Sequence, residues 1–127
     1  MQKLLLIMAG GAVGSLLRYL LSGWGQRIGG GSFPWGTLLV NVVGCLLIGA
    51  LGALFSGPQL IREEYRVALL VGFLGALTTF STFGWESFAL VNERQWSMAL
   101  LNVAASNGLA LSAVWLGFRV TEKWWGV

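Results

Sequence analysis

Hydroxyl and aromatic side chains are gathered in residues 78–83, within an apolar stretch that carries no charge from 67 to 85. A hydroxyl donates one hydrogen bond, and the edge of a phenylalanine ring carries partial positive charge. Several such weak donors, including the edges of Phe80 and Phe83, could together replace the water around a small, hard anion. The structural alternative is core packing of both rings, with the hydroxyls bonded back to their own helix.

The same run is expected to interrupt a helix. Gly72 and Gly75 precede it, and glycine, serine and β-branched residues together weaken helical structure. An interruption at membrane depth frees backbone carbonyls and amides, which must be buried in protein, line a wet cavity or hold an ion.

Other polar residues lie in apolar surroundings, where each needs a partner or a function. Arg18 either extends to the membrane surface or provides a fixed positive charge in a vestibule. Asn41, one helical turn after Thr37, either bonds a neighbouring helix or lines a pore. Glu86 is expected near the interruption or at a vestibule end, in a salt bridge or a regulatory role.

Small residues predict close helix contacts in two places. Gly10 and Gly14 are four residues apart, which lets another helix approach closely. A second stripe of small or polar residues suits the same purpose; it comprises Asn102, Ser106, Ala110, Ala113 and Gly117.

The elements that position these residues are predicted from composition. Of the 127 residues, 56% are hydrophobic and 10% are charged, far fewer charges than the roughly 25% of a soluble domain. We therefore expect an all-α integral membrane protein, one domain over 1–127, with the third of four transmembrane helices broken near its middle. The spans are expected near 3–22, 36–56, 65–92 and 96–120, the first being retained rather than cleaved as a signal peptide.

The links between these spans are short. The first, residues 29–34, is glycine-rich, and Pro34 is placed to start the next helix. The second, at Ser56, Gly57 and Pro58, ends the second span.

Charges and aromatic residues predict how the chain sits in the bilayer. One face carries Tyr65, Trp124 and Trp125, and the other carries Trp24, Trp35 and Trp96, as expected for membrane interfaces. Basic residues are divided five against two or three, a weak bias that permits insertion in both orientations. The larger group is Lys3, Arg62, Arg66, Arg119 and Lys123; the smaller is Arg27 and Arg94, with Arg18 nearby. Four helices enclose little space, so an oligomer is expected.

Several function classes are disfavoured. The chain has no histidine, and its one cysteine, Cys45, lies in an apolar run, so neither a common general base nor an intrachain disulfide is available. No nucleophile or phosphate-binding motif is visible, so we do not expect an enzyme. The net charge of +3 is spread out, without the basic stripe that nucleic-acid binding requires.

Residues 36–44 and 72–83 resemble the Fluc-type (CrcB) fluoride channels, and the glycine-rich run 10–14 with Arg18 fits the same family. The similarity covers essentially the whole chain, and the run 78–83 is its specific part. The resemblance implies passive, selective fluoride efflux through the cytoplasmic (inner) membrane. It also implies a homodimer of two copies in opposite orientations, with two pores.

The resemblance implies residue roles by matching position. Arg18 would line a vestibule, and Glu86 would lie near the far end of a pore. The backbone carbonyls of Gly75 and Thr78 would hold a structural Na⁺ between the two subunits, and four such oxygens suit a hard cation. The fluoride-facing residues would be Asn41, Phe80, Ser81, Thr82, Phe83 and Ser106.

The chain also departs from the family pattern. Ala76 stands where the family often has a second glycine, and Gly84 and Trp85 replace a small polar pair. Asn102 and Ala110 stand where some members have an aromatic residue and a hydroxyl.

Two other functions stay open from the residues. A proton-coupled small-cation exporter of the small multidrug resistance type would share the size, the four spans and the weak charge bias. Such an exporter needs a membrane carboxylate, normally in the first span, and Glu86 in the third is the candidate here. A non-transporting assembly subunit would use its polar residues for helix packing alone.

Overall fold

The computed structural model describes residues 1–57 and 61–126, and Pro58 of the expected second link lies outside them. The described part of the chain is helical throughout, apart from short links. In chain order its elements are α1 (Gln2–Gly29), α2 (Trp35–Ser56), α3 (Glu63–Val67), the π-helix η1 (Ala68–Leu74), α4 (Gly75–Leu77), α5 (Phe80–Asn92) and α6 (Trp96–Trp125).

Within the described residues, four helical segments are long and apolar enough to cross a membrane: Gln2–Gly29, Trp35–Ser56, Glu63–Asn92 and Trp96–Trp125. The prediction of four spans in an all-α protein is confirmed. The expected first span near 3–22 lies within α1, which continues as a helix to Gly29. Its 28 residues extend about 42 Å, longer than the roughly 30 Å hydrocarbon core, so its polar last turns can lie outside the apolar layer.

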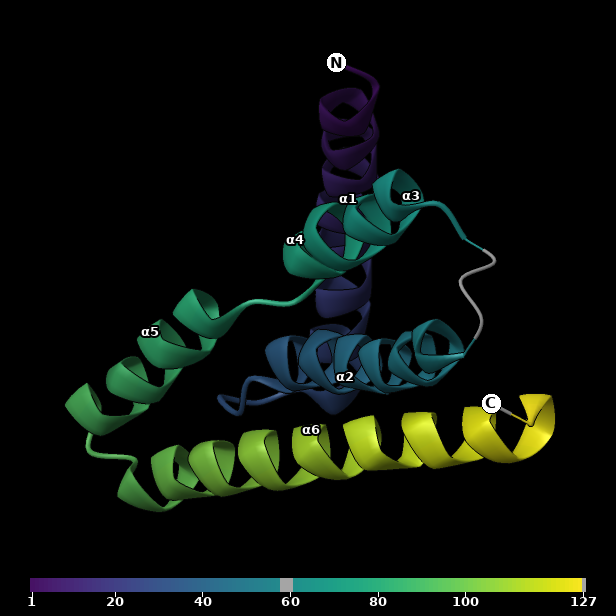
Figure 1. The fold of residues 1–127 in the computed structure, drawn as a ribbon. Coiled ribbons are helices and arrows are strands. Elements are labelled where there is room, and N and C mark those ends of the chain that lie inside the picture. The colour runs from purple at the N-terminus through teal and green to yellow at the C-terminus, as the bar shows by residue number, and fades with distance from the viewer. Residues whose placement is uncertain (58–60, 127) are drawn as a thin grey trace.

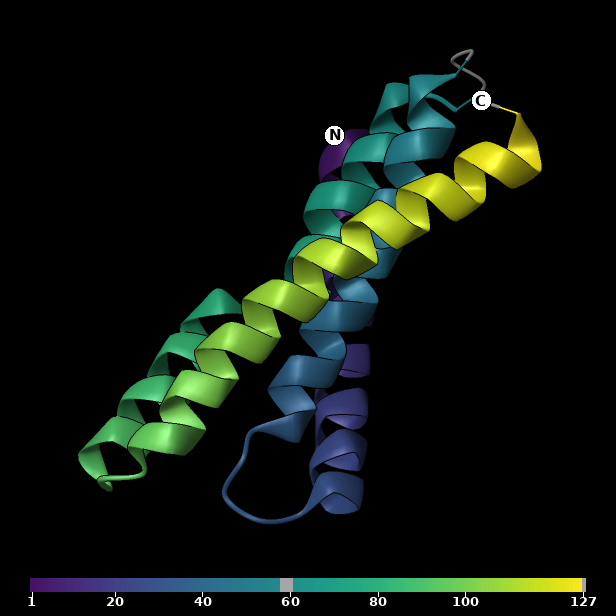
Figure 2. The same cartoon turned by 90° about the horizontal axis from the view of Figure 1, so that it is seen from below.

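The helices cross at steep angles, and both termini lie at one end of the molecule (Figure 2). The start of α3 lies at that same end, whereas the α1–α2 and α5–α6 links lie at the other. In Figure 1, α2 lies beside the middle and second half of α6, and α5 approaches the first half of α6 toward the link that joins them. The α5–α6 pair forms an arm that diverges from α1 and α2 (Figure 2).

Glycines on α1 allow η1 to approach its backbone, as the spacing of Gly10 and Gly14 predicted. A Cβ added at Gly14 would overlap the carbonyl oxygen of Phe73, and one at Gly10 would lie 2.7 Å from that of Ala68. The contact is reciprocal, since a Cβ at Gly72 would lie 2.6 Å from the carbonyl oxygen of Ile7. The absence of side chains here brings the two backbones together, the usual packing solution in lipid.

The stripe on α6 is also a helix contact. A Cβ added at Gly117 would overlap the carbonyl oxygen of Leu46 on α2, and one at Gly49 of α2 would overlap that of Val114. Asn102, Ser106 and Ala113 of the stripe are buried, as is Gly117. The predicted packing role of the stripe is therefore confirmed for these residues.

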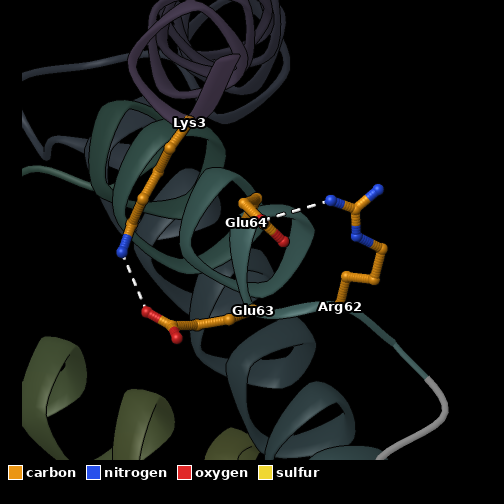
Figure 3. A network of polar contacts seen from close by, with 4 residues as sticks. All are labelled: Lys3, Arg62, Glu63 and Glu64. Carbon is orange, nitrogen blue, oxygen red and sulfur yellow. Dashed lines mark hydrogen bonds and ion pairs between the residues drawn. The ribbon is translucent and has the colours of Figure 1, made fainter. Parts of the chain in front are cut away.

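Two ion pairs lie at the start of α3, and one of them joins α3 to α1. Lys3 at the start of α1 contacts Glu63 at the start of α3, with Nζ and Oε1 2.9 Å apart (Figure 3). Arg62 and Glu64 form a second pair at 3.3 Å (Figure 3). Both pairs are solvent-exposed, so each contributes little stability, about 0–1 kcal/mol.

Candidate functional site

Thr78 and Thr79 interrupt the helical path between α4 and α5 with extended backbone. Their ψ angles are 159° and 117°. The amide of Thr78 still donates to the carbonyl of Leu74 at 3.0 Å, but that of Thr79 donates to the side chain of Asn41 instead. In a continuous helix the Thr79 amide would donate to the carbonyl of Gly75, but here it donates to Asn41.

Asn41 on α2 binds both backbone groups of Thr79. Its Oδ1 accepts from Thr79 N at 2.8 Å, and its Nδ2 donates to Thr79 O at 3.0 Å. This double hydrogen bond replaces the partners that a continuous helix would have supplied, which matters where no water is present to do so. Of the two alternatives for Asn41, the hydrogen bond to a neighbouring helical segment is realised, and the same side chain also lines the cavity described next.

An open cavity of about 350 Å³, here called the apolar groove, lies against the interruption. Its walls come from α2, η1, α4, α5 and α6. Six of the predicted site residues line it: Asn41, Gly75, Thr78, Phe80, Phe83 and Ser106. Side chains from segments far apart in the sequence thus meet in one place.

The two phenylalanines sit at the rim and the wall of this groove. Their ring centroids are 5.3 Å apart and their planes are inclined by 45°. Phe83 is only 9% exposed, whereas Phe80 is 81% exposed. Ring edges carry partial positive charge, so two rings that line the groove can offer an anion weak contacts without a formal charge.

A second cavity of about 330 Å³, here called the polar cavity, is lined by Ser15, Arg18, Ser22, Thr37, Thr79 and Thr82, with Tyr19 and Val40. Arg18 donates from Nη1 to the carbonyl of Thr78 at 3.3 Å. Thr79 lines both cavities. Thr79 therefore lies between the apolar groove and the polar cavity, which contains the guanidinium of Arg18.

Thr79 also begins α5. Its Oγ1 accepts from the amide of Thr82 at 3.2 Å, which satisfies one free donor of the new helix. The same oxygen is 2.9 Å from Thr82 Oγ1 and 3.3 Å from Ser81 Oγ. Ser81 belongs to this hydroxyl cluster but lines neither cavity.

Glu86, two turns into α5, lines neither cavity. Its Oε1 accepts from Thr37 Oγ1 at 2.7 Å, which links α5 to α2. Its Oε2 is buried and has no hydrogen-bond partner among the described residues. The salt-bridge alternative for Glu86 is not realised there, since its recorded partner is a hydroxyl.

The residues expected to hold Na⁺ can be tested for fit. Gly75 and Thr78 both line the apolar groove. Gly75 lies in the short helix before the interruption and Thr78 is part of the interruption, where backbone carbonyls lose their helical partners. Neutral carbonyl oxygens suit a hard cation. The Thr78 carbonyl also accepts from Arg18, so a cation there would share that oxygen with a guanidinium.

Sequence reasoning missed Ser15 and Ser22, which line the polar cavity, and also Ser87. Ser87 donates to the carbonyl of Phe83 at 2.8 Å and accepts from Asn102 Nδ2 at 2.9 Å. Asn102 in turn accepts from Ser106 at 3.2 Å. The available signal was a serine one turn after Phe83, at a position where it can bond back to that carbonyl.

Four membrane-length helices, with polar groups from several of them meeting inside, define a multi-pass membrane protein. Residues 5–118 match the family model described as CrcB-like protein, Camphor Resistance (CrcB). The chain belongs to the CrcB family, and the resemblance drawn from the sequence is confirmed.

Curated relatives extend across nearly the whole chain. A protein of Nitrosococcus oceani is 45% identical over 121 residues, 95% of this chain and 97% of its own length. A protein of Geobacter sulfurreducens is 45% identical over 97% of this chain and 99% of its own length. A third, from Geobacter metallireducens, is 46% identical over 88% of this chain and 90% of its own length. Each of the three is named a fluoride-specific ion channel FluC, a name that denotes a channel rather than an enzyme.

Proposed function

We propose that this chain is a passive, fluoride-selective channel that lets fluoride leave the cell through the cytoplasmic membrane. The observation that carries the proposal is the apolar groove, where Asn41, Phe80, Phe83 and Ser106 meet at a helix interruption. The names of the relatives support the choice of ion. A groove of weak donors with no carboxylate among its described lining residues suits an anion.

Fluoride would pass between ring edges and polar groups rather than between formal charges. Phe80 and Phe83 would present their edges, while Asn41 and the hydroxyls of Ser81 and Thr82 would donate hydrogen bonds. Ser106 would line the path, since its hydroxyl proton is donated to Asn102. Fluoride holds its water tightly, so several donors must act together. Arg18 in the polar cavity would raise the local concentration of anions at the entrance.

The working unit would be a homodimer of two copies in opposite orientations, with two pores. Phe80 is 81% exposed, and the groove is open in the single chain, so a second copy has both an apolar surface and a polar interruption to cover. A Na⁺ between the copies would bind the Gly75 and Thr78 carbonyls of each. When bound, it would supply positive charge that stabilises these carbonyls and joins the subunits.

The test is fluoride efflux from liposomes that contain the purified protein, measured with a fluoride electrode. A passive channel moves charge, so efflux should require a potassium ionophore that compensates it. Chloride-loaded liposomes and protein-free liposomes are the controls. If folded protein gives no fluoride flux above empty liposomes, the proposal is refuted.

The same assay tests the phenylalanines. Phe80→Ile and Phe83→Ile keep apolar bulk but remove the ring edges, so each should sharply reduce fluoride efflux while the dimer stays intact by size-exclusion chromatography. Unchanged flux in both variants would remove their proposed role. The exporter alternative predicts fluoride-independent, substrate-driven proton movement that is lost in Glu86→Gln.

A further inference from the structure

A chain of hydrogen bonds, buried at Asn102 and Ser106 and partly buried at Ser87, connects α6 to the backbone of α5. Ser106 donates to Asn102 Oδ1 at 3.2 Å, Asn102 Nδ2 donates to Ser87 Oγ at 2.9 Å, and Ser87 donates to Phe83 O at 2.8 Å. We call these four groups the Asn102 relay. Its two ends, Ser106 and Phe83, line the apolar groove, whereas Asn102 lies behind them and is only 1% exposed.

The donors and acceptors of the relay fix one another. A serine hydroxyl has one proton, and that of Ser87 is given to the carbonyl of Phe83. Ser87 can therefore only accept from Asn102, so the amide nitrogen faces Ser87 and the amide oxygen faces Ser106. With the Asn102 amide in this one orientation, all three hydrogen bonds of the relay form.

The relay acts on α5, which is otherwise tied to α2 by the bond from Thr37 to Glu86 and by the bonds of Asn41 with Thr79. α5 begins at the interruption and is joined to α6 at its far end by the turn after Asn92. It approaches the first half of α6 toward that turn (Figure 1) and diverges from α1 and α2 (Figure 2). The bond from Asn102 to Ser87 joins α6 to α5, and the bond from Ser87 to the Phe83 carbonyl lies within α5, one turn further back. The first bond therefore sets the height of this turn of α5, and of Phe83 with it, against α6.

We propose that Asn102 is a positioning residue, which acts through Ser87 to hold Phe83 in place at the apolar groove. The inference rests on the proposed fluoride function. Asn102 contacts the groove only through its neighbours, so its contribution is to where Phe83 and Ser106 stand. Displacing a ring edge by a fraction of an ångström weakens a contact that depends on distance and direction.

The test compares two variants of Ser87 that have the same shape. Ser87→Thr keeps the hydroxyl and Ser87→Val removes it, both with a branched side chain. We expect fluoride efflux within about twofold of the unmodified protein for Thr and about tenfold lower for Val, the effect of roughly one lost hydrogen bond on a rate. Equal rates for the two variants, whether high or low, would overturn the proposal.

Asn102→Leu removes the amide at nearly constant volume and is expected to lower efflux about as much as Ser87→Val. If both residues act in one chain, the double variant should be no slower than Asn102→Leu alone. Additive losses would instead assign Asn102 a separate role. Should Asn102→Leu fail to fold by size-exclusion chromatography, the Ser87 pair alone decides the outcome.

Ser112→Val is the matched control, since Ser112 is exposed on α6 outside both cavities. It should leave efflux unchanged, and a tenfold loss there would show that any serine replacement in this protein slows transport and would overturn the proposal. Measuring the unmodified protein in the same assay distinguishes the proposed fluoride function from the role of the relay. Absence of fluoride flux from it refutes the proposed function, whereas normal flux with no Thr–Val difference refutes only the role of the relay.

Discussion

At the scale of single residues, the interruption is stable because side chains substitute for backbone partners. Asn41 supplies one donor and one acceptor to Thr79, and Thr79 supplies its own hydroxyl to Thr82. Each group left without a partner in an apolar environment costs about 1–3 kcal/mol. Asn41 is therefore a structural residue of the interruption, in addition to any contact it makes with an ion.

Replacement of Asn41 should measure this contribution. Asn41→Leu conserves volume but leaves both backbone groups of Thr79 unpaired, so we expect the free energy of unfolding to fall by about 1–3 kcal/mol for each group. The midpoint of thermal unfolding in detergent, followed by tryptophan fluorescence, reports the loss. Asn107→Leu is the control, because Asn107 is exposed and bonds the carbonyl of Val103 on its own helix. Similar destabilisation by both variants would contradict the assignment.

At the scale of elements, close packing depends on glycines that have no room for a methyl group. Gly14 meets the carbonyl of Phe73, whereas Gly23, on the same helix, has nothing within 4 Å of an added Cβ. Gly14→Ala should destabilise the protein by about 1–3 kcal/mol, because α1 and η1 must separate. Gly23→Ala should instead stabilise it by about 0.5–1 kcal/mol through helix propensity. Thermal unfolding in detergent compares the two, and equal shifts would show that the contact is not specific.

Much of this architecture follows from the sequence because hydrophobic length is a strong signal. The four spans, the glycine contacts of α1 and the buried stripe of α6 were all predictable from spacing and composition. The end of α1 was not, since its last turns are polar yet remain helical as far as Gly29. Hydropathy predicts where the apolar layer ends. The helix itself continues for as long as its backbone hydrogen bonds do, which in α1 is as far as Gly29.

Other features depend on which helices meet, and no local pattern shows this. The seven residues of η1 form a π-helix although nothing in their apolar sequence distinguishes them from an α-helix. Ser87 and Asn102 are 15 residues apart on two helices, so their hydrogen bond appears only once α5 and α6 are paired. The same holds for Arg18 and the carbonyl of Thr78, which are 60 residues apart.

At the scale of the whole molecule, the charges leave the orientation in the membrane nearly undecided. The face with both termini carries five basic residues and the other carries two, with Arg18 inside the first span. For so short a chain this bias is weak, and basic residues in short loops are what set orientation. In the proposed antiparallel dimer, an inverted copy would cover the apolar groove, and such a dimer requires both orientations.

A cysteine-labelling experiment in intact cells should detect the two orientations directly. Cys45 is the one cysteine of the chain, so Cys45→Ala provides a background without thiols. Into it, Ser32→Cys places a reporter in the exposed α1–α2 link, and Gln2→Cys places one at the face that holds both termini. A membrane-impermeant maleimide reaches only thiols outside the cytoplasmic membrane.

If the chain inserts both ways in equal numbers, each reporter should be labelled to about half of the level seen after permeabilisation. A single orientation would give complete labelling of one reporter and none of the other. That outcome would exclude the antiparallel dimer even if fluoride flux were measured, because a pair of inverted copies requires both orientations in one membrane.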